Sequence, residues 1–229
     1  MALGQDGQDQ LDIWRDLATA PRALLSDNHT LPLMREFNIG HIRLGVFPRV
    51  SESLSWVYLE GSQNSVGDVL DMILQALEGL AYIHSLGIAH RDAFKTNFLV
   101  QFWPESLITG VVPAVRFPED CPPSDRVCTG LPLAGSITDG YRRNLIPEML
   151  SGEPYDPFKL DVWQLATSLV DFDSTLGPVE AVLDDMASMD PTYRLTANEA
   201  LSRLRAYIES VPPKSLLFPP VVHKNLPLQ

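Results

Sequence analysis

The feature that most constrains the fold is a long amphipathic pattern over residues 65–86. Its hydrophobic positions recur every three or four residues, at Val66, Leu70, Ile73, Leu77 and Leu80. This spacing places them on one face of an α-helix, and that face must be covered by other parts of the chain. Ser65 and Asp68 have the spacing of a capping box, and Gly87 suits the turn that ends a helix. The pattern predicts a long helix within a core of helices.

The segments around this helix predict a mixture of helices and short strands. Helices are expected at residues 11–25, 158–172, 179–189 and 196–208, a hairpin within 29–50, and strands at 98–100 and 111–117. Residues 51–64 are expected to form a loop with one apolar insertion. Residues 1–10 are polar and contain glycine, so we expect them to be disordered.

The composition excludes several classes of function. The chain has 17 Lys and Arg against 29 Asp and Glu, which gives a formal net charge of −12. Only four of its 229 residues are lysines and none precedes Lys95, so the clustered cations that bind nucleic acid or anionic membranes are missing. The two cysteines provide no disulfide framework. With no signal peptide and no apolar stretch of about 20 residues, we expect an intracellular protein, cytoplasmic or nuclear.

One polar string combines residues with a defined chemistry. His90, Arg91 and Asp92 are consecutive, and Asn97 follows five residues after the Asp. An Asp in such a loop accepts the proton of an attacking hydroxyl, and the Asn binds Mg²⁺ beside the transferred phosphoryl group. The spacing matches H-R-D-x-x-x-x-N, the catalytic loop of protein kinases.

Three further strings follow in the order in which protein kinases carry them. They are Ile146-Pro147-Glu148, Asp161-Val162-Trp163 and Asp190-Pro-Thr-Tyr-Arg194. Together with the catalytic loop they resemble the eukaryotic protein kinase fold over residues 65–210. The stretches AHRDAFKTNFLV and GEPYDPFKLDVWQL resemble more narrowly the divergent protein-kinase-domain proteins of mushroom-forming fungi.

The resemblance implies an α+β, protein kinase-like fold, mainly an α-helical C-lobe with a truncated N-lobe remnant. It divides the chain into a disordered N-terminus (residues 1–10), a reduced N-lobe remnant (11–64), the C-lobe (65–210) and a Pro-rich C-terminal tail (211–229). It also implies transfer of a phosphoryl group from ATP to Ser or Thr, with Mg²⁺, on a protein substrate, or binding of a protein partner. Asp92 would then be the catalytic residue, and Asn97 would bind the cofactor through Mg²⁺.

The same resemblance assigns structural roles to four residues. Arg91 would pair with a phosphate or carboxylate of the activation segment. Glu148 and Arg194 would form a buried ion pair that fastens this segment to the C-lobe. Asp161 would hydrogen-bond to the backbone of the catalytic loop.

Four elements of the kinase phosphate site are missing from the sequence. No Gly-rich loop is present, and no lysine before Lys95 exists to bind the α- and β-phosphates. The first glutamate is Glu36, which leaves no helix Glu to partner such a lysine. The Asp-Phe-Gly string is absent, and Thr138-Asp139-Gly140 lies too close to Pro147 to replace it. Asp120 is better placed to bind metal, with a solvated loop carboxylate as the alternative.

The cations near the catalytic loop also depart from the family pattern. Lys95 lies three residues after Asp92, where many Ser/Thr kinases place a lysine two residues after. Arg142 and Arg143 form either a solvated pair or a contact to a substrate or phosphate.

Three functions stay open at this point. They are a Ser/Thr kinase, a pseudokinase that binds a protein partner, and a shortened isoform or fragment of a larger kinase. Each missing electrostatic element typically costs about 10²–10³ in rate. The sequence therefore predicts impaired or absent phosphoryl transfer.

Overall fold

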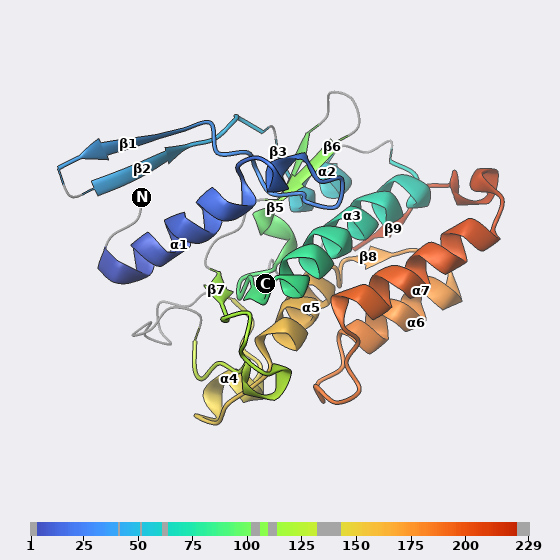
Figure 1. Cartoon of the computed structure of the whole chain (residues 1–229). Coiled ribbons are helices and arrows are strands. Elements are labelled where there is room, and N and C mark those ends of the chain that lie inside the picture. Colours follow the sequence, from blue (N-terminus) through green and yellow to red (C-terminus); the bar gives the residue numbers. More distant parts are fainter. Residues whose placement is uncertain are drawn as a thin grey trace.

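The computed structural model describes residues 4–40, 42–50, 52–60, 64–101, 106–109, 114–131 and 143–223. The helices are α1 (Gly4–Leu17), α2 (Leu54–Glu60), α3 (Val66–Ser85), α4 (Pro147–Leu150), α5 (Pro157–Ser168), α6 (Gly177–Met186) and α7 (Ala197–Ser210). The strands are β1 (Arg35–Ile39), β2 (Ile42–Val46), β3 (Glu52–Ser53), β4 (Ile88–Ala89), β5 (Phe98–Gln101), β6 (Ser106–Thr109), β7 (Val115–Arg116), β8 (Phe172–Asp173) and β9 (Val221–Val222). Figure 1 shows α3, α5, α6 and α7 gathered at one end of the molecule and the β1–β2 hairpin projecting at the other.

Helix α3 is the centre of the largest hydrophobic cluster. All five positions of the predicted stripe are buried in this cluster, together with residues of α5, α6 and α7. Ser65 and Asp68 form the predicted capping box, and Gly87 has a positive φ of 70°. A residue with a Cβ adopts this conformation at a cost, so the glycine suits the sharp exit from the helix. These predictions are confirmed, and they place the segment after Gly87 directly on the core.

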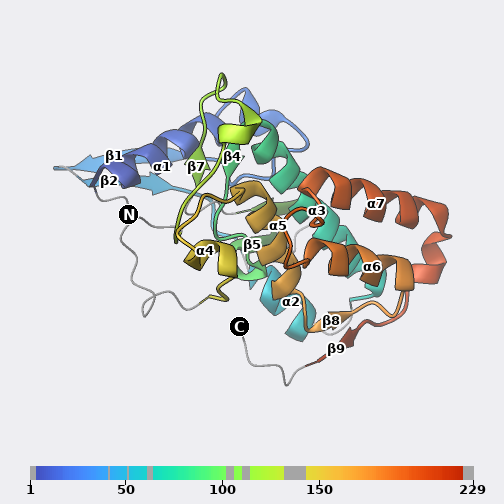
Figure 2. The same cartoon turned by 90° about the horizontal axis from the view of Figure 1, so that it is seen from below.

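The N-terminal part forms a smaller layer beside this core. In Figures 1 and 2, α1 lies along the hairpin, and both extend away from the bundle of α3, α5, α6 and α7. Strands β1 and β2 pair antiparallel, with Phe37 opposite Leu44, which confirms the predicted hairpin. Arg15 of α1 donates to both carboxylate oxygens of Glu36 over 2.8 Å, so a surface ion pair joins the helix to the hairpin.

Helix α1 begins at Gly4, so residues 4–10 are helical, whereas the sequence predicted disorder over residues 1–10. Ile13, Trp14 and Leu17 are buried on one side of this helix. The rings of Trp14 and Phe47 meet edge to face, with centroids 4.3 Å apart. These contacts anchor the second half of α1, and its regular backbone continues from there toward the N-terminus.

The predicted loop over residues 51–64 is wrong, because Leu54–Glu60 form helix α2. Leu54 and Val57 are almost fully buried and lie three residues apart, as one face of a short helix requires. Strand β3 precedes α2 and pairs with β5, and β5 also pairs with β6. Strands β3 and β6 therefore flank β5, the strand predicted after the loop that contains Asp92.

The C-terminal helices agree with the pattern in the sequence. Helix α5 is buried on most sides, and α7 begins with the predicted capping box of Thr196 and Glu199. After α7, strand β9 of the Pro-rich tail pairs with β8. None of the helices within the described ranges combines the length and apolar character that crossing a bilayer requires.

Candidate active site

The residues of the polar string lie in a loop between two strands at the centre of the molecule. Strand β4 ends at Ala89, His90 is buried, a 3₁₀ turn covers Lys95–Asn97, and β5 begins at Phe98. Strand β4 pairs antiparallel with β7, and β5 pairs with β3 and β6. The loop is therefore fastened at both ends, although it has little regular hydrogen bonding of its own.

One face of α5 supplies the missing hydrogen bonds to this loop. Asp161, which has no solvent exposure, accepts from the backbone N–H of His90 over 2.7 Å and of Arg91 over 2.6 Å. Gln164 accepts from the N–H of Ala93 over 2.8 Å. Its amide also donates to the carbonyl of Arg91 over 3.2 Å. The helix thus holds the loop backbone with side chains instead of a sheet ladder.

A third residue of α5 extends this row. The Ser168 hydroxyl accepts from the N–H of Lys95 over 2.9 Å. Asp161, Gln164 and Ser168 are spaced by three and four residues, so they share one helical face. The sequence analysis named only Asp161, although the spacing of these polar residues in a largely buried helix is a signal that points to all three.

Arg91 adopts a strained backbone and reaches a neighbouring segment. Its φ is 64°, a conformation uncommon for residues other than glycine, and the bond from its N–H to Asp161 supports it. Its guanidinium donates to the carbonyl of Leu131 over 2.9 Å and to the Tyr155 hydroxyl over 3.2 Å. These two partners are neutral, and the pairing of Arg91 with a phosphate or carboxylate stays a prediction.

Asp92 and Asn97 lie in direct contact. The Asn97 amide donates 2.7 Å hydrogen bonds to both Oδ2 and the backbone carbonyl of Asp92. The other carboxylate oxygen, Oδ1, is buried and accepts no hydrogen bond from the described residues. Burial raises the pKa of Asp92 above its usual value, while the nearby Arg143 guanidinium and the Asn97 amide partly offset this. One carboxylate oxygen is therefore fixed by Asn97, while the other accepts no hydrogen bond from the described residues.

Arg143 is the cation beside this carboxylate. Its Nε lies 3.5 Å from Asp92 Oδ1, and its guanidinium carbon lies 5.1 Å from the centroid of the Phe94 ring. The side chain of Arg143 is 27% exposed. The arginine is thus placed between an aromatic face, the carboxylate and solvent.

Lys95 is directed into the core instead of toward Asp92. Its Nζ donates to both oxygens of Asp171, over 2.6 and 2.5 Å. Burial lowers the pKa of Lys95, and the hydrogen bonds to Asp171 oppose this shift. The loop lysine therefore balances a buried carboxylate next to β8.

Glu148 and Arg194 form a bidentate ion pair. Arg194 donates to the two carboxylate oxygens over 3.0 and 3.2 Å, and its side chain has no solvent exposure. Arg194 also donates to the carbonyl of Ser188 over 2.9 Å. The pair joins α4 to the segment before α7, and so brings together two residues that lie 46 positions apart.

Asp120 does not join the cluster around Asp92. It lies in an exposed turn after β7, and no hydrogen bond or ion pair connects it to Asp92 or Asn97 in the described part of the chain. Within those same ranges, no group of three or more His, Cys, Asp or Glu side chains is arranged to bind a metal. Thr138-Asp139-Gly140 falls outside the described residues.

Asn97 nevertheless has an atom suited to Mg²⁺. Its amide nitrogen donates both of its hydrogen bonds to Asp92, and its amide oxygen accepts none from the described residues. Mg²⁺ prefers oxygen ligands and often keeps several waters, so it requires few protein groups. The amide oxygen of Asn97 is therefore one atom of the kind that binds Mg²⁺.

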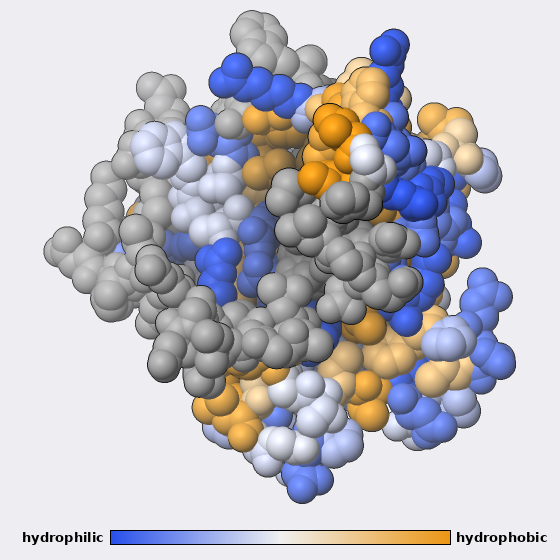
Figure 3. Space-filling view, turned by 90° about the vertical axis from the view of Figure 1, so that its left-hand side faces the viewer, coloured by the Kyte–Doolittle hydropathy of each residue, from blue (hydrophilic) through white to orange (hydrophobic). Residues whose placement is uncertain are grey.

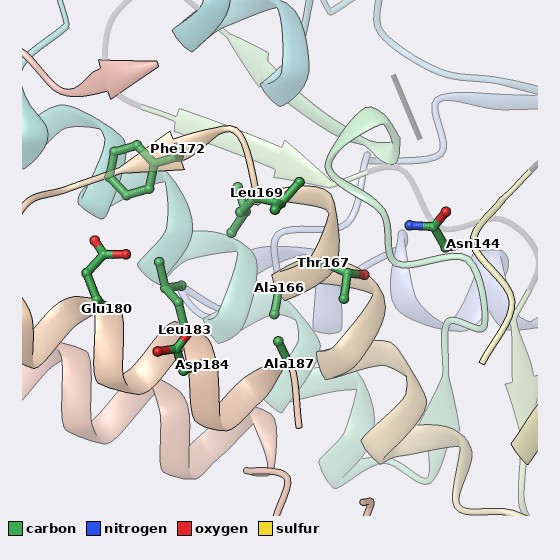
Figure 4. Close-up of a pocket in the computed structure, with 10 residues that line it drawn as sticks. Asn144, Ala166, Thr167, Leu169, Phe172, Glu180, Leu183, Asp184 and Ala187 are labelled. Carbon is green, nitrogen blue, oxygen red and sulfur yellow. The ribbon is translucent and has the colours of Figure 1, made fainter. Parts of the chain in front are cut away.

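A cavity of 280 Å³ borders the same region, between the end of α5 and α6 (Figure 4). Asn144 lies at its edge and directly follows Arg143 in the chain. Neither Asp92 nor Asn97 lines it. Its walls mix apolar side chains with two carboxylates and are formed by Asn144, Ala166, Thr167, Leu169, Val170, Phe172, Glu180, Leu183, Asp184 and Ala187.

Comparison with known proteins finds relatives that are named as serine/threonine-protein kinases. The chain is 32% identical to human testis-specific serine/threonine-protein kinase 4 over 143 residues, and this match covers 54% of the chain. It is 26% identical over 210 residues, or 85% of its length, to serine/threonine-protein kinase Tao of Drosophila melanogaster. A third relative, from Dictyostelium discoideum, is named a probable inactive serine/threonine-protein kinase and is 30% identical over 138 residues, or 58% of this chain.

These relatives support a protein kinase-like domain. The mixture of helices and short sheets in the structure is compatible with that fold. The matches span 43%, 17% and 11% of the three relatives, so this chain corresponds to less than half of each protein. No family model matches the chain.

Proposed function

We propose that this chain contains a kinase-type phosphotransferase site, in which Asp92 receives the proton of a Ser or Thr hydroxyl as ATP supplies the phosphoryl group. The observation that carries the proposal is the hydrogen-bonded pair of Asp92 and Asn97 on a loop fastened to α5. A random loop Asp would need neither a buried oxygen without a hydrogen bond from the described residues nor a row of three side chains fixing its backbone.

Each residue of the site has a defined task in this proposal. Asn97 fixes Oδ2 of Asp92, so Oδ1 is the oxygen that would receive the proton of the hydroxyl. Burial raises the pKa of Asp92 and makes it a better proton acceptor when it is ionised. The amide oxygen of Asn97 would bind Mg²⁺, which supplies positive charge to the phosphate oxygens. Asp161, Gln164 and Ser168 act indirectly, because they position the backbone that carries Asp92.

We expect transfer to be slow compared with a complete kinase. The sequence contains neither a Gly-rich loop nor a lysine before Lys95, and both contribute to binding the phosphates. Losing one such element typically costs about 10²–10³ in rate, and combined losses do not add simply. Substrate recognition would rely on surfaces near the loop, including the cavity beside Asn144.

The second candidate is a pseudokinase that binds a protein partner without transferring phosphate. The missing phosphate-binding elements favour it, as does the relative named a probable inactive kinase. Metal binding by Asp120, the narrower fungal placement and the possibility of a shortened form remain predictions. Transcript sequence upstream of Met1 and between Leu107 and Phe117 would test the shortened form.

The two candidates are separated by a transfer assay with the full chain. ATP labelled in its terminal phosphate is incubated with Mg²⁺ and a generic Ser/Thr protein substrate, and the label on serine and threonine is measured. We expect slow incorporation that Asp92→Asn abolishes and Asn97→Ala strongly reduces, with both variants folded by circular dichroism. Incorporation that is absent in the wild type, or unchanged in Asp92→Asn, contradicts the proposed transfer and leaves the pseudokinase.

A further inference from the structure

The charge next to Asp92 comes from a residue outside the catalytic loop. Arg143 lies 51 positions after Asp92, and its Nε is 3.5 Å from the carboxylate oxygen that accepts no hydrogen bond in the described part of the chain. The Phe94 ring supports the guanidinium from one side, at 5.1 Å from its centroid. An arginine on an aromatic face keeps its orientation while its edge stays open to hydrogen bonding.

The lysine of the loop itself is hydrogen-bonded to a different carboxylate. Lys95 is almost completely buried, and both oxygens of Asp171 accept from its Nζ. Moving Lys95 toward Asp92 would break both of its hydrogen bonds to the buried Asp171 carboxylate, which is strongly unfavourable. Lys95 therefore cannot supply positive charge at Asp92, and Arg143 is the cation in contact with that carboxylate.

The guanidinium of Arg143 has unused hydrogen-bonding capacity. An arginine carries five N–H donors in a planar fork that matches two oxygens of a phosphate. Apart from its ion pair with Asp92, Arg143 makes no hydrogen bond or ion pair with the described residues. Its side chain is also 27% exposed, so a ligand in solvent can reach it.

A phosphate needs such a cation at this position. An anionic phosphoryl group that approaches Asp92 meets a negative carboxylate, and repulsion between partly buried charges is strong. Arg143 cancels the charge of Asp92 and offers donors to the incoming oxygens. The same contact keeps the side chain of Arg143 beside the atom that receives the proton.

We propose that Arg143 binds the terminal phosphate of a nucleoside triphosphate beside Asp92, in the place that Lys95 leaves without a cation. The inference rests on the proposed phosphotransferase function, and it adds a binding residue from the segment before α4. It also gives a role to one member of the Arg142 and Arg143 pair, for which the sequence left two interpretations open.

The test is the affinity of the full chain for Mg-ATP and Mg-ADP, measured by isothermal titration calorimetry. Arg143→Gln should weaken Mg-ATP binding by about ten-fold to a hundred-fold, the range expected for one charge-assisted hydrogen-bonding group. It should leave Mg-ADP binding nearly unchanged, because ADP lacks the terminal phosphate. Arg143→Lys keeps the charge but loses the fork, so its affinity for Mg-ATP should be intermediate.

The matched control is Arg203→Gln, which removes another arginine paired with an aspartate. Arg203 bonds to Asp185 over 2.8 Å on the exposed surface of α7, so neither nucleotide should lose affinity. Thermal unfolding of each variant shows that a change in affinity is not a loss of folded protein.

Each outcome decides the inference. Equal affinities of wild type and Arg143→Gln for Mg-ATP, or equal losses for Mg-ATP and Mg-ADP, would overturn it. A wild-type chain that binds neither nucleotide would overturn it as well. A further outcome is that Arg143→Gln loses affinity for Mg-ATP but not for Mg-ADP while the wild type transfers no phosphate to protein. That result would support Arg143 as a phosphate-binding residue and contradict the proposed transfer.

Discussion

Helix α3 and the β1–β2 hairpin contain comparable hydrophobic side chains but use them in opposite ways. Ten residues of α3 are buried, whereas every residue of β1 is exposed. Figure 3 shows hydrophobic residues near the top of the face from which the hairpin projects, and Phe37 and Ile39 are 49% and 64% exposed. The contrast indicates that the helical part stabilises the fold and supports the loop around Asp92, while the hairpin contributes little to either.

The largest expected effect is in the helical part, at its buried ion pair. Glu148→Gln removes the charge that balances Arg194, whose side chain has no solvent exposure. Leaving a buried charge without its partner costs about 3–5 kcal/mol, and urea unfolding should show this loss in the free energy of unfolding. Asp185→Asn is the control, because its pair with Arg203 is exposed and contributes about 1 kcal/mol or less. Similar losses in both variants would show that Glu148 and Arg194 are not buried together.

The next effect concerns the core around α3. Leu70→Ala leaves a cavity at a side chain with no exposure, and we expect a loss of about 2–5 kcal/mol in the free energy of unfolding. Leu24→Ala makes the same substitution at a position that is 81% exposed, and it should change the free energy of unfolding by about 0.5 kcal/mol or less. If Leu70→Ala unfolds no more easily than Leu24→Ala, α3 is not the centre of the core.

A smaller effect is expected at the start of α7. The Thr196 hydroxyl accepts from the N–H of Glu199, so Thr196→Ala should cost about 1 kcal/mol in thermal or urea unfolding. Ser202→Ala lies on the exposed face of the same helix and should be neutral or slightly stabilising, since Ala has the higher helix propensity. Destabilisation by Ser202→Ala equal to that by Thr196→Ala would remove the case for a capping box.

The smallest effect is expected in the hairpin. Phe37→Ser replaces a half-exposed ring and should change the free energy of unfolding by about 0.5 kcal/mol or less. A loss above about 2 kcal/mol would mean that this face is covered in solution, and would break the contrast with α3.

Local signals in the sequence were sufficient for the long elements. The stripe from Val66 to Leu80 and the two capping boxes predicted α3 and α7, because their information lies within one helix. Helix α2 was missed, since seven residues are too few to establish a helical period. Leu54 and Val57 become recognisable as one face only when the surrounding core is known.

The site was predictable in its residue types but not in its charges. The spacing of Asp92 and Asn97 singled out both residues, and the structure adds that the Asn97 amide lies 2.7 Å from the Asp92 carboxylate. The pairing of Lys95 with Asp171 and of Arg143 with Asp92 joins residues 76 and 51 positions apart. Such ion pairs depend on how the elements pack, and no local pattern in the sequence specifies them.

The central claim is that α5 holds the loop around Asp92 in a fixed conformation, and amide hydrogen exchange tests it most directly. The N–H groups of Arg91, Ala93 and Lys95 bond to side chains of α5, so they should exchange far more slowly than the exposed amides of the hairpin. Gln164→Ala should accelerate exchange at Ala93 first. Exchange of these three amides as fast as that of the exposed hairpin amides, unaffected by Gln164→Ala, would contradict the account.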